Sequence, residues 1–385
     1  MMPQAQRQAS DLPRRPLVSI FMFVRNGATS VRRALDSMLA LSYPNIEFIV
    51  QEGVSTDGTL DILRQYGDRL NLNIVSEPDS GPNEGLWRAL NRCSGEFIGS
   101  CLADEELIPD AITRALDVLL NEPDVGAVTG DAIITDAQGN RMGSWTSGPF
   151  SLVDYLLCDY TPYFCSSFFR RQSLLDSGLK SGKWSEDCVE FELWCRLATH
   201  SRIKYMPGVN AKYASHAGQS SNKARDVLVH FAGRLRMIAT LCSDAGLVGD
   251  APVLRGAFIW GHTRAFINHA IAFNNPANAE ALYDVARRTM DQFGPVAGLS
   301  AMPPATKPFW SSLFGRRNSA TGTSAIAAKL PPPPDPILKT RLYAHLAARY
   351  EDHGRLQEAI DSWRWTAETA GIIAAPPRDK SYKEG

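Results

Sequence analysis

Residues 46–59, IEFIVQEGVSTDGT, join a mostly apolar run to a turn rich in Gly, Ser, Thr and Asp. The run IEFIV predicts a buried strand, and TLDILRQYG at 59–67 predicts the helix that follows the turn. A strand that passes through a polar turn into a helix is the repeating unit of a parallel sheet. This stretch therefore predicts an α/β fold.

The same alternation continues on both sides of this unit. Strands are expected at LVSIFMFV (17–24), LNIVSE (72–77) and EFIGSCL (96–102), and helices at TSVRRALDSMLA (29–40) and GLWRALNRC (85–93). Further elements expected are a helix at 110–120, a hairpin at 126–142 around the turn DAQGN, strands at 164–171 and 202–207, and a helix at 189–198. The pattern predicts a mixed, mainly parallel sheet flanked by helices.

The chain is expected to divide into five regions along its length. These are a disordered tail at 1–15, the α/β domain at 16–225, a helical region at 226–300, a linker rich in Pro, Ser and Ala at 301–338, and a tetratricopeptide-like helical hairpin at 339–375. A lone repeat needs a neighbour to bury its apolar face. The hairpin is therefore expected to pack on the helical region or on a second subunit, which makes a homo-oligomer an open alternative.

Composition excludes several classes of protein. Forty basic and 41 acidic residues leave no net positive charge for binding nucleic acid. No window is long and apolar enough for a membrane span, and the N-terminus lacks the apolar core of a signal peptide. The seven cysteines form no CxxC pair and are expected to be buried reduced thiols. We expect a cytoplasmic enzyme, with association at the inner face of the membrane left open.

Polar clusters follow four of the expected strands, where parallel sheets bind their ligands. They read FVRNG (23–27), IVQEGVSTDGT (49–59), SEPDSGPNEG (76–85) and LADEE (102–106). Their order and spacing resemble the family 2 glycosyltransferases, which are inverting enzymes of the GT-A fold. The resemblance covers roughly residues 17–222. It implies a nucleotide-sugar donor, a glycan or lipid-linked acceptor, and Mn²⁺ or Mg²⁺ as cofactor.

The resemblance assigns donor-binding roles to the first three clusters. Glu52 stands where the family has an Asp that accepts a hydrogen bond from the base, usually uracil, although a solvated loop acid is the alternative. Asp57 and Gly58 are expected to shape the turn, and Val54 replaces a Gly or small polar residue. The other residues expected to bind the nucleotide sugar are Val24, Asn26, Asp79, Glu84, Arg88, Ala103 and Asp104. For Arg88 a solvated helix face is the alternative, and Trp87 is either a wall of the donor pocket or part of the core.

Asp104 aligns with the last Asp of the family's Asp-x-Asp motif and is the expected metal ligand, while Leu102 occupies the place of the first Asp. A departing diphosphate needs a cation, and carboxylate oxygens suit Mg²⁺ or Mn²⁺. Glu105 and Glu106 are expected to lead into a helix that begins near Pro109, and the alternative is that one of them helps Asp104 to hold the metal.

The general base is expected in WSEDCVEFELWCRL at 184–197. Alignment with the family favours Glu190, with Asp187 as the competitor one helical turn earlier. Downstream, His216 is a candidate for the metal or the diphosphate, and Ser220 and Ser221 for phosphate. Arg170 and Arg171 are expected either to orient the acceptor or diphosphate or to be surface charges.

The function expected is inverting, metal-dependent transfer of a sugar, from UDP by the Glu52 assignment, in the synthesis of a cell-surface polysaccharide. The alternative is a non-catalytic GT-A domain that binds nucleotide sugar or glycan and scaffolds an assembly, since Leu102 removes one acid. A nucleotidyltransferase is disfavoured because FVRNGATS is not a Gly-rich phosphate loop.

Overall fold

The computed structural model describes residues 12–156, 162–178, 189–215, 231–235, 237–238, 258–259 and 262. The chain divides into two compact units, one formed by residues 1–152 and 160–234 and the other by 153–159 and 235–385. The linker expected at 301–338 and the hairpin expected at 339–375 lie outside the described residues, as does most of the helical region expected at 226–300.

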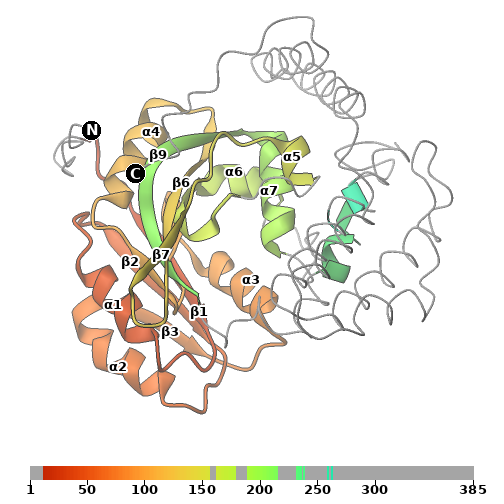
Figure 1. The fold of residues 1–385 in the computed structure, drawn as a ribbon. Coiled ribbons are helices and arrows are strands. Elements are labelled where there is room, and N and C mark those ends of the chain that lie inside the picture. Colours follow the sequence, from red (N-terminus) through yellow and green to blue (C-terminus); the bar gives the residue numbers. More distant parts are fainter. Residues whose placement is uncertain are drawn as a thin grey trace, which may run out of the picture. The chain divides into compact units, whose positions relative to one another are not determined.

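Strands and helices alternate through the first part of the domain (Figure 1). The elements are β1 (Val18–Val24), α1 (Val31–Leu39), β2 (Ile46–Glu52), α2 (Thr59–Leu70), β3 (Leu72–Ser76), α3 (Pro82–Arg92) and β4 (Phe97–Ser100). The four strands pair in parallel in the order β3-β2-β1-β4. The parallel sheet predicted from the alternation is confirmed.

The second part of the domain extends this sheet with strands of both directions. Its elements are β5 (Glu105–Leu107), α4 (Ala111–Asn121), β6 (Val125–Thr135), β7 (Arg141–Trp145), α5 (Leu152–Leu156), a 3₁₀ turn (Phe164–Ser166), β8 (Ser167–Arg170), α6 (Arg171–Asp176), α7 (Val189–His200) and β9 (Arg202–Ala214). The order continues β4-β8-β6-β9-β5, and β7 pairs with β6 as an antiparallel hairpin. The predicted mixed α/β class is confirmed.

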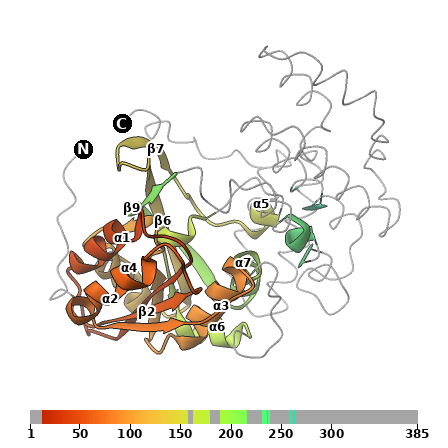
Figure 2. The same cartoon turned by 90° about the horizontal axis from the view of Figure 1, so that it is seen from below.

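Helices cover both faces of the sheet, as Figures 1 and 2 show. On one face Val18, Ile20 and Met22 of β1 pack in a core with α1, α2 and α4. Phe21 points the other way, towards the side covered by α3, α6 and α7, and is equally buried. Burial on both faces explains why β1 is a continuous apolar run rather than an alternating one.

One prediction about the fold is wrong. Glu105 and Glu106 do not begin a helix, because residues 105–107 form β5, which pairs antiparallel with Ala211–Tyr213 of β9. Helix α4 begins at Ala111. The carboxylate of Glu106 forms ion pairs with Arg33 of α1 at 2.6 Å and Lys212 of β9 at 3.2 Å. The pairing with β9 overrides the local preference of acids for a helix start.

Two further findings concern the predicted reduced cysteines and the search for membrane spans. Cys93, Cys101, Cys165 and Cys195 are free thiols in the described residues, and all four are buried. Within the described ranges, no helix is both long enough and apolar enough to span a bilayer.

Candidate functional site

The loops after β1 and β2 are tied together by hydrogen bonds. The Asn26 amide donates to Ser55 Oγ at 2.8 Å, and the Thr56 amide donates to Asn26 Oδ1 at 2.9 Å. The Ala28 amide donates to Asp57 Oδ2 at 2.9 Å. The Asn26 residue, predicted to bind the donor, thus holds these two loops together at the carboxyl ends of the parallel strands.

Asp57 and Gly58 have the structural roles predicted for them. Asp57 also accepts a hydrogen bond from the Thr59 amide at 3.1 Å. Gly58 immediately precedes α2 with φ of 90°, a left-handed conformation that costs glycine little. Together they fix where α2 begins.

Glu52 ends β2 with its side chain completely buried. Its carboxylate accepts hydrogen bonds from the amides of Val54 (3.1 Å) and Ser55 (2.6 Å) and from the Ser76 hydroxyl. Burial alone would raise the pKa of Glu52, but these bonds lower it below its usual value. To read a base, as predicted, the carboxylate would have to exchange one of these bonds for one from the ligand.

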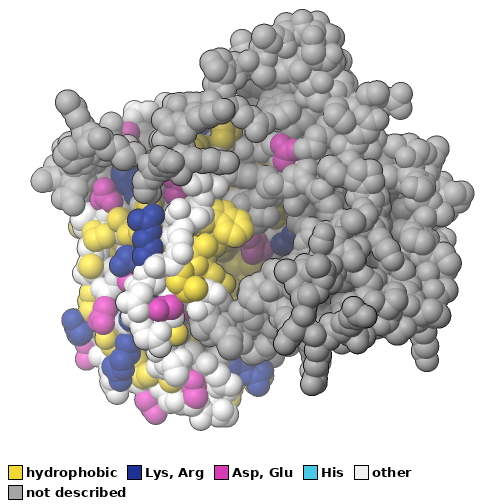
Figure 3. Space-filling view, in the orientation of Figure 1, with side chains coloured by type: hydrophobic (Ala, Val, Ile, Leu, Met, Phe, Trp, Pro, Cys, Tyr) yellow, Lys and Arg dark blue, Asp and Glu magenta, His cyan; other side chains and the backbone are white. Residues whose placement is uncertain are grey.

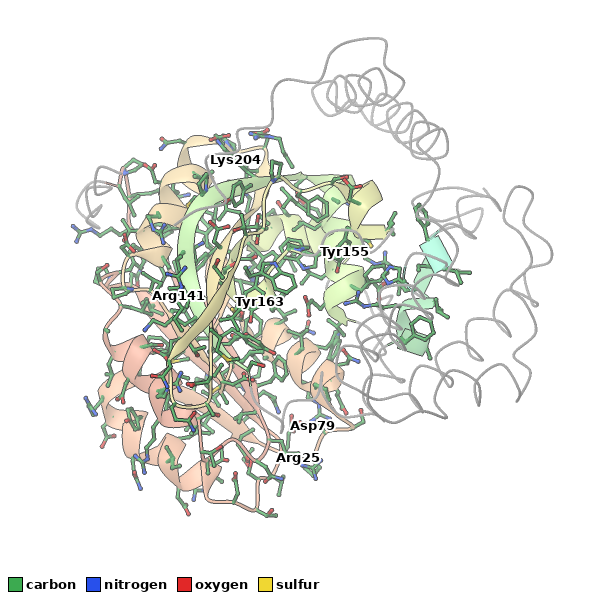
Figure 4. The ribbon with its side chains drawn as sticks, in the orientation of Figure 1. Arg25, Asp79, Arg141, Tyr155, Tyr163 and Lys204 are labelled. Atoms are coloured by element: carbon green, nitrogen blue, oxygen red, sulfur yellow. The ribbon has the colours of Figure 1, made fainter. Side chains whose placement is uncertain are left out.

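Asp79 and Arg25 lie together over Gly53 (Figure 4). A Cβ added to Gly53 would lie 2.7 Å from Asp79 Oδ2 and 3.2 Å from the Arg25 Cβ. Asp79 also accepts a hydrogen bond from the Gly81 amide at 3.1 Å. Burial raises the pKa of Asp79, whereas this hydrogen bond and the charge of Arg25 oppose the shift. Arg25 is exposed, so the pair presents both signs of charge to a ligand.

Glu84 and Arg88 are engaged with each other and with the loop before α3. Glu84 accepts a hydrogen bond from the Ser80 amide at 2.6 Å, which lowers the pKa of Glu84. Arg88 pairs with Glu84 and with Glu77 (3.0 Å) and donates to the Pro78 carbonyl at 2.9 Å. These contacts favour the structural alternative for Arg88 over a phosphate contact.

Gly27 brings Val24 and Ala103 into contact across two loops. A Cβ at Gly27 would lie 2.8 Å from Val24 Cγ2 and 3.1 Å from Ala103 Cβ. The turn that carries Asp104 therefore packs directly on the loop after β1. This contact joins the predicted donor-binding residues of the first and fourth strands.

Asp104 lies partly exposed in the turn between β4 and β5. The Ala214 amide at the end of β9 donates to the Asp104 carbonyl at 2.9 Å. Glu105 points inward instead, and its carboxyl accepts a hydrogen bond from the Leu102 amide at 2.7 Å. Asp104 and Glu105 are adjacent in sequence but have opposite environments.

The Glu105 carboxyl is surrounded by other buried polar groups. Burial, reinforced by the Asp104 carboxylate, raises the pKa of Glu105 to about 8 despite the hydrogen bonds from Leu102 and Cys165. Burial also raises the pKa of the Cys165 thiol and of the Tyr163 hydroxyl, which lie beside it. Burial therefore favours the neutral form of all three groups.

Glu190 lies near the same turn from the opposite part of the chain. The charges of both Asp104 and Glu190 act on the Glu105 carboxyl, which places the first turn of α7 near the loop after β4. Burial raises the pKa of Glu190, and the charge of Arg234 opposes the shift. Arg234 lies over the Phe191 ring at 5.3 Å.

Several predicted residues lie elsewhere. Asp187, His216, Ser220 and Ser221 are outside the described residues. Arg170 donates to the Val125 carbonyl, and Arg171 to the Cys93 carbonyl, both at 3.1 Å. Phe97, which begins β4, pairs with Arg170. Both arginines therefore contact backbone carbonyls near the amino ends of β4 and β6 rather than the candidate site.

A sequence model of glycosyl transferase family 2 matches residues 19–177. This part of the chain is similar to glycosyl transferase family 2. Among curated relatives, a chondroitin synthase of Pasteurella multocida (strain Pm70) is 24% identical over 220 residues, covering 56% of this chain and 22% of that protein. An uncharacterized glycosyltransferase of Rickettsia prowazekii (strain Madrid E) is 28% identical over 228 residues, covering 56% of this chain and 69% of that protein.

The chain thus matches about a fifth of the chondroitin synthase, at 22% of its length. Among solved structures, a mannosyltransferase from Pyrobaculum calidifontis in complex with GDP-Man and Mn²⁺ is 16% identical with a TM-score of 0.46, covering 96% of this chain and 91% of that one. The predicted GT-A fold agrees with the family match and with the mixed sheet described above.

The family 2 match includes every donor-side residue from Val24 to Asp104 and ends before Glu190. The donor set at the fourth strand contains one outward carboxylate, because Leu102 has no ligating atom and Glu105 is turned inward. Across the described residues no three His, Cys, Asp or Glu side chains form a metal cage. One hard oxygen ligand fits a Mg²⁺ or Mn²⁺ ion held jointly with a diphosphate.

The sequence prediction missed two residues, Arg25 and Arg234, and the buried position of a third, Glu105. Arg25 follows β1 directly, so its place at the strand's end could have identified it. Glu105 could not be recognised as buried, because β5 has only three residues and its partner strand is distant in sequence. Arg234 carries no local motif, and only the tertiary structure brings it to Phe191 and Glu190.

Proposed function

We propose that this domain is an inverting glycosyltransferase that moves a sugar from a nucleotide-sugar donor to a polysaccharide acceptor. The observation that carries the proposal is the match to glycosyl transferase family 2, which includes the candidate donor-side residues from Val24 to Asp104. The names of the curated relatives, chondroitin synthase and hyaluronan synthase, support an amino-sugar-containing polysaccharide as the acceptor.

The nucleotide is bound at the ends of β1, β2 and β3. Asp79 offers an acceptor carboxylate and Arg25 a planar cation that can pair with phosphate or stack on a base. Glu52 acts by fixing the turn that presents Val54 and Ser55. We propose UDP as the nucleotide, because the Glu52 carboxylate can exchange one of these hydrogen bonds for one from the N–H of uracil.

Asp104 would hold a divalent cation at the diphosphate end of the donor, with His216 as the second candidate ligand. When bound, that cation supplies a Lewis acid that neutralises the charge of the departing nucleoside diphosphate. Leu102 adds no charge to the site, and the raised pKa of Glu105 favours its uncharged form.

Glu190 removes the proton from the acceptor hydroxyl as that oxygen attacks the anomeric carbon, which inverts the configuration there. Its raised pKa suits a general base that must bind a proton in the transition state. Asp187 is the alternative base. We propose that the reaction takes place in the cytoplasm. Association of the protein with the inner face of the membrane and with a second copy of the chain stay predictions.

The test is a turnover assay with a panel of UDP- and GDP-sugars and Mn²⁺, with and without EDTA. Asp104→Asn is expected to lose turnover by at least about 100-fold, by analogy with the loss of one charge-stabilising group. Asp68→Asn is the matched control, because Asp68 is an exposed acid near the end of α2 and away from the site.

A separate pair of substitutions tests which residue is the general base. Glu190→Gln is expected to keep nucleotide binding and lose turnover by about 10²- to 10⁴-fold. If Asp187→Asn gives that result and Glu190→Gln does not, Asp187 is the base. Nucleotide binding without turnover of any sugar by the unaltered protein would favour the scaffold alternative over an enzyme.

A further inference from the structure

A row of side chains crosses the sheet from β7 to β5 on one face. In register, Gly143 of β7 lies opposite Ile134 of β6, Ile134 opposite Tyr213 of β9, and Tyr213 opposite Glu105 of β5. Residues two apart on a strand share a face, so Trp145 lies on this face beside Gly143. The row therefore connects Trp145 with the carboxyl next to Asp104.

Aromatic rings fill the space above this row. Trp145 packs against Tyr163 with their ring centroids 5.6 Å apart, and Tyr163 meets Tyr213 edge-on at 5.4 Å. Tyr163 also lies near the Glu105 carboxyl, because the two groups interact electrostatically. Three rings thus form a continuous surface that leads from the hairpin to the turn of Asp104.

The outer end of this surface is open. Trp145 is 38% exposed, and a Cβ added to Gly143 would meet nothing within 4 Å. Next to them Met142 is 67% exposed at a bulge in the pairing of β6 and β7. Figure 3 shows hydrophobic side chains gathered on one part of the described surface. Bulges of this kind are common next to active sites.

An exposed Trp on an edge strand is a liability for aggregation unless it has a use. A pyranose ring has an apolar face of C–H groups, which packs on a flat aromatic ring while its hydroxyls stay in water. The space over Gly143 is open beside such a ring. A sugar is therefore the ligand that fits both the exposed indole and the missing side chain.

We propose that Trp145, with the space over Gly143 and the support of Tyr163, binds a sugar ring of the acceptor glycan away from its reacting end. Three strand spacings separate β7 from β5, roughly 14 Å. A ligand that reaches from the Asp104 turn to Trp145 is therefore longer than one sugar ring. This inference rests on the proposed function for the identity of the ligand, and it assigns an oligosaccharide rather than a monosaccharide acceptor.

The test is binding of chondroitin and hyaluronan oligosaccharides of increasing length, measured by calorimetry and by saturation-transfer NMR on the full chain. Trp145→Ala is expected to weaken binding of the longer oligosaccharides about tenfold or more, which is about 1.4 kcal/mol, and to leave disaccharide and UDP binding unchanged. Gly143→Phe, which fills the open space beside the indole, is expected to have the same effect. Trp145→Phe should retain most of the affinity.

Met142→Ala is the matched control, because it removes a more exposed apolar side chain from the same strand. Wild-type affinity of Trp145→Ala for the longest oligosaccharide would overturn the proposal, as would the failure of the unaltered protein to bind any of them. Glycan binding needs no turnover. A protein that binds these glycans through Trp145 but transfers no sugar would thus refute the proposed function and leave this site standing.

Discussion

Val54 is held in a conformation that its side chain disfavours. It has φ of 55°, in the left-handed region, and its β-branched side chain is 47% exposed. Its amide donates to Glu52, so the buried carboxylate holds the strained backbone in place. Strain of this kind concentrates at functional sites, and here it lies at the proposed donor edge.

Val54→Gly is therefore expected to stabilise the protein. Glycine removes a steric cost of about 1 kcal/mol in the left-handed region, although part of the gain is offset by a more flexible unfolded chain. Urea unfolding would show a higher midpoint. Thr56→Gly is the control, because Thr56 lies in the same turn without a positive φ and should only lose stability. A lower midpoint for Val54→Gly would contradict the strain.

Arg234 is expected to set the pH range in which Glu190 is an active base. Its positive charge favours the carboxylate and so lowers the pKa that burial raises. Arg234→Gln should therefore raise the pKa of Glu190 and move the acidic limb of the kcat/KM profile to higher pH. Arg196→Gln is the control, because Arg196 pairs with Glu192 at 2.6 Å. If the acidic limb of the kcat/KM profile does not shift in Arg234→Gln, Arg234 does not influence the pKa of the base.

At the scale of elements, the periodicity of the sequence was sufficient for the parallel half of the sheet. Runs such as LVSIFMFV are apolar throughout because their strands are buried on both faces, and this signal is local. Residues 105–107 carry no such signal. Their strand exists because β9 supplies a partner, and β9 itself continues to Ala214, well past the predicted end at residue 207.

The candidate site, like the sheet, has features that local sequence signals predict and features that depend on tertiary contacts. The clusters after β1, β2 and β3 could be located from sequence because strand ends in a parallel sheet converge. What each side chain does there depends on tertiary contacts. Glu52 and Arg88 use their hydrogen bonds within their own loops, whereas Arg25 and Asp79 lie over a glycine that only the structure reveals as a close contact.

Gly53→Ala tests the close packing of the loops after β1, β2 and β3, where Arg25 and Asp79 lie against Gly53. The new Cβ would lie 2.7 Å from Asp79 Oδ2, so the Asp79 and Arg25 side chains must move. We expect the KM for the nucleotide sugar to rise about tenfold, a loss of about 1.4 kcal/mol in binding, with a smaller change in kcat. Gly67→Ala, in α2 with nothing within 4 Å of its added Cβ, should leave KM unchanged. Equal effects of the two substitutions would contradict the role of Gly53.

At the scale of the whole molecule, β2 carries a hydrogen-bonded glutamate at each end of the sheet. Glu52 lies at the carboxyl end. At the amino end, Glu47 accepts hydrogen bonds from the Ser94 amide at 2.7 Å, the Gly95 amide at 3.0 Å and the Ser19 hydroxyl. Burial alone would raise the pKa of Glu47, but these bonds lower it overall. Both ends of β2 thus depend on an ionised carboxylate.

Stability is therefore expected to fall in acid, with a sign that follows from the lowered pKa. The folded protein holds the Glu47 carboxylate ionised more strongly than the unfolded chain does, whose pKa is about 4.3. The contribution to stability is complete above that value and is lost as the pH falls through the lower folded pKa. Glu47→Gln should thus lower the urea midpoint at neutral pH, and its difference from the unaltered protein should narrow below about pH 4.

The control for this comparison is Asp68→Asn, which removes an exposed carboxylate from α2 and should change the midpoint little at either pH. If the gap between Glu47→Gln and the unaltered protein stays constant from neutral to acid pH, the loss comes from shape or packing at residue 47. If the difference between the two urea midpoints narrows in acid, the loss of stability comes from the ionised carboxylate. Protonation of Glu47 then removes the same stabilisation from the unaltered protein that Glu47→Gln has already removed.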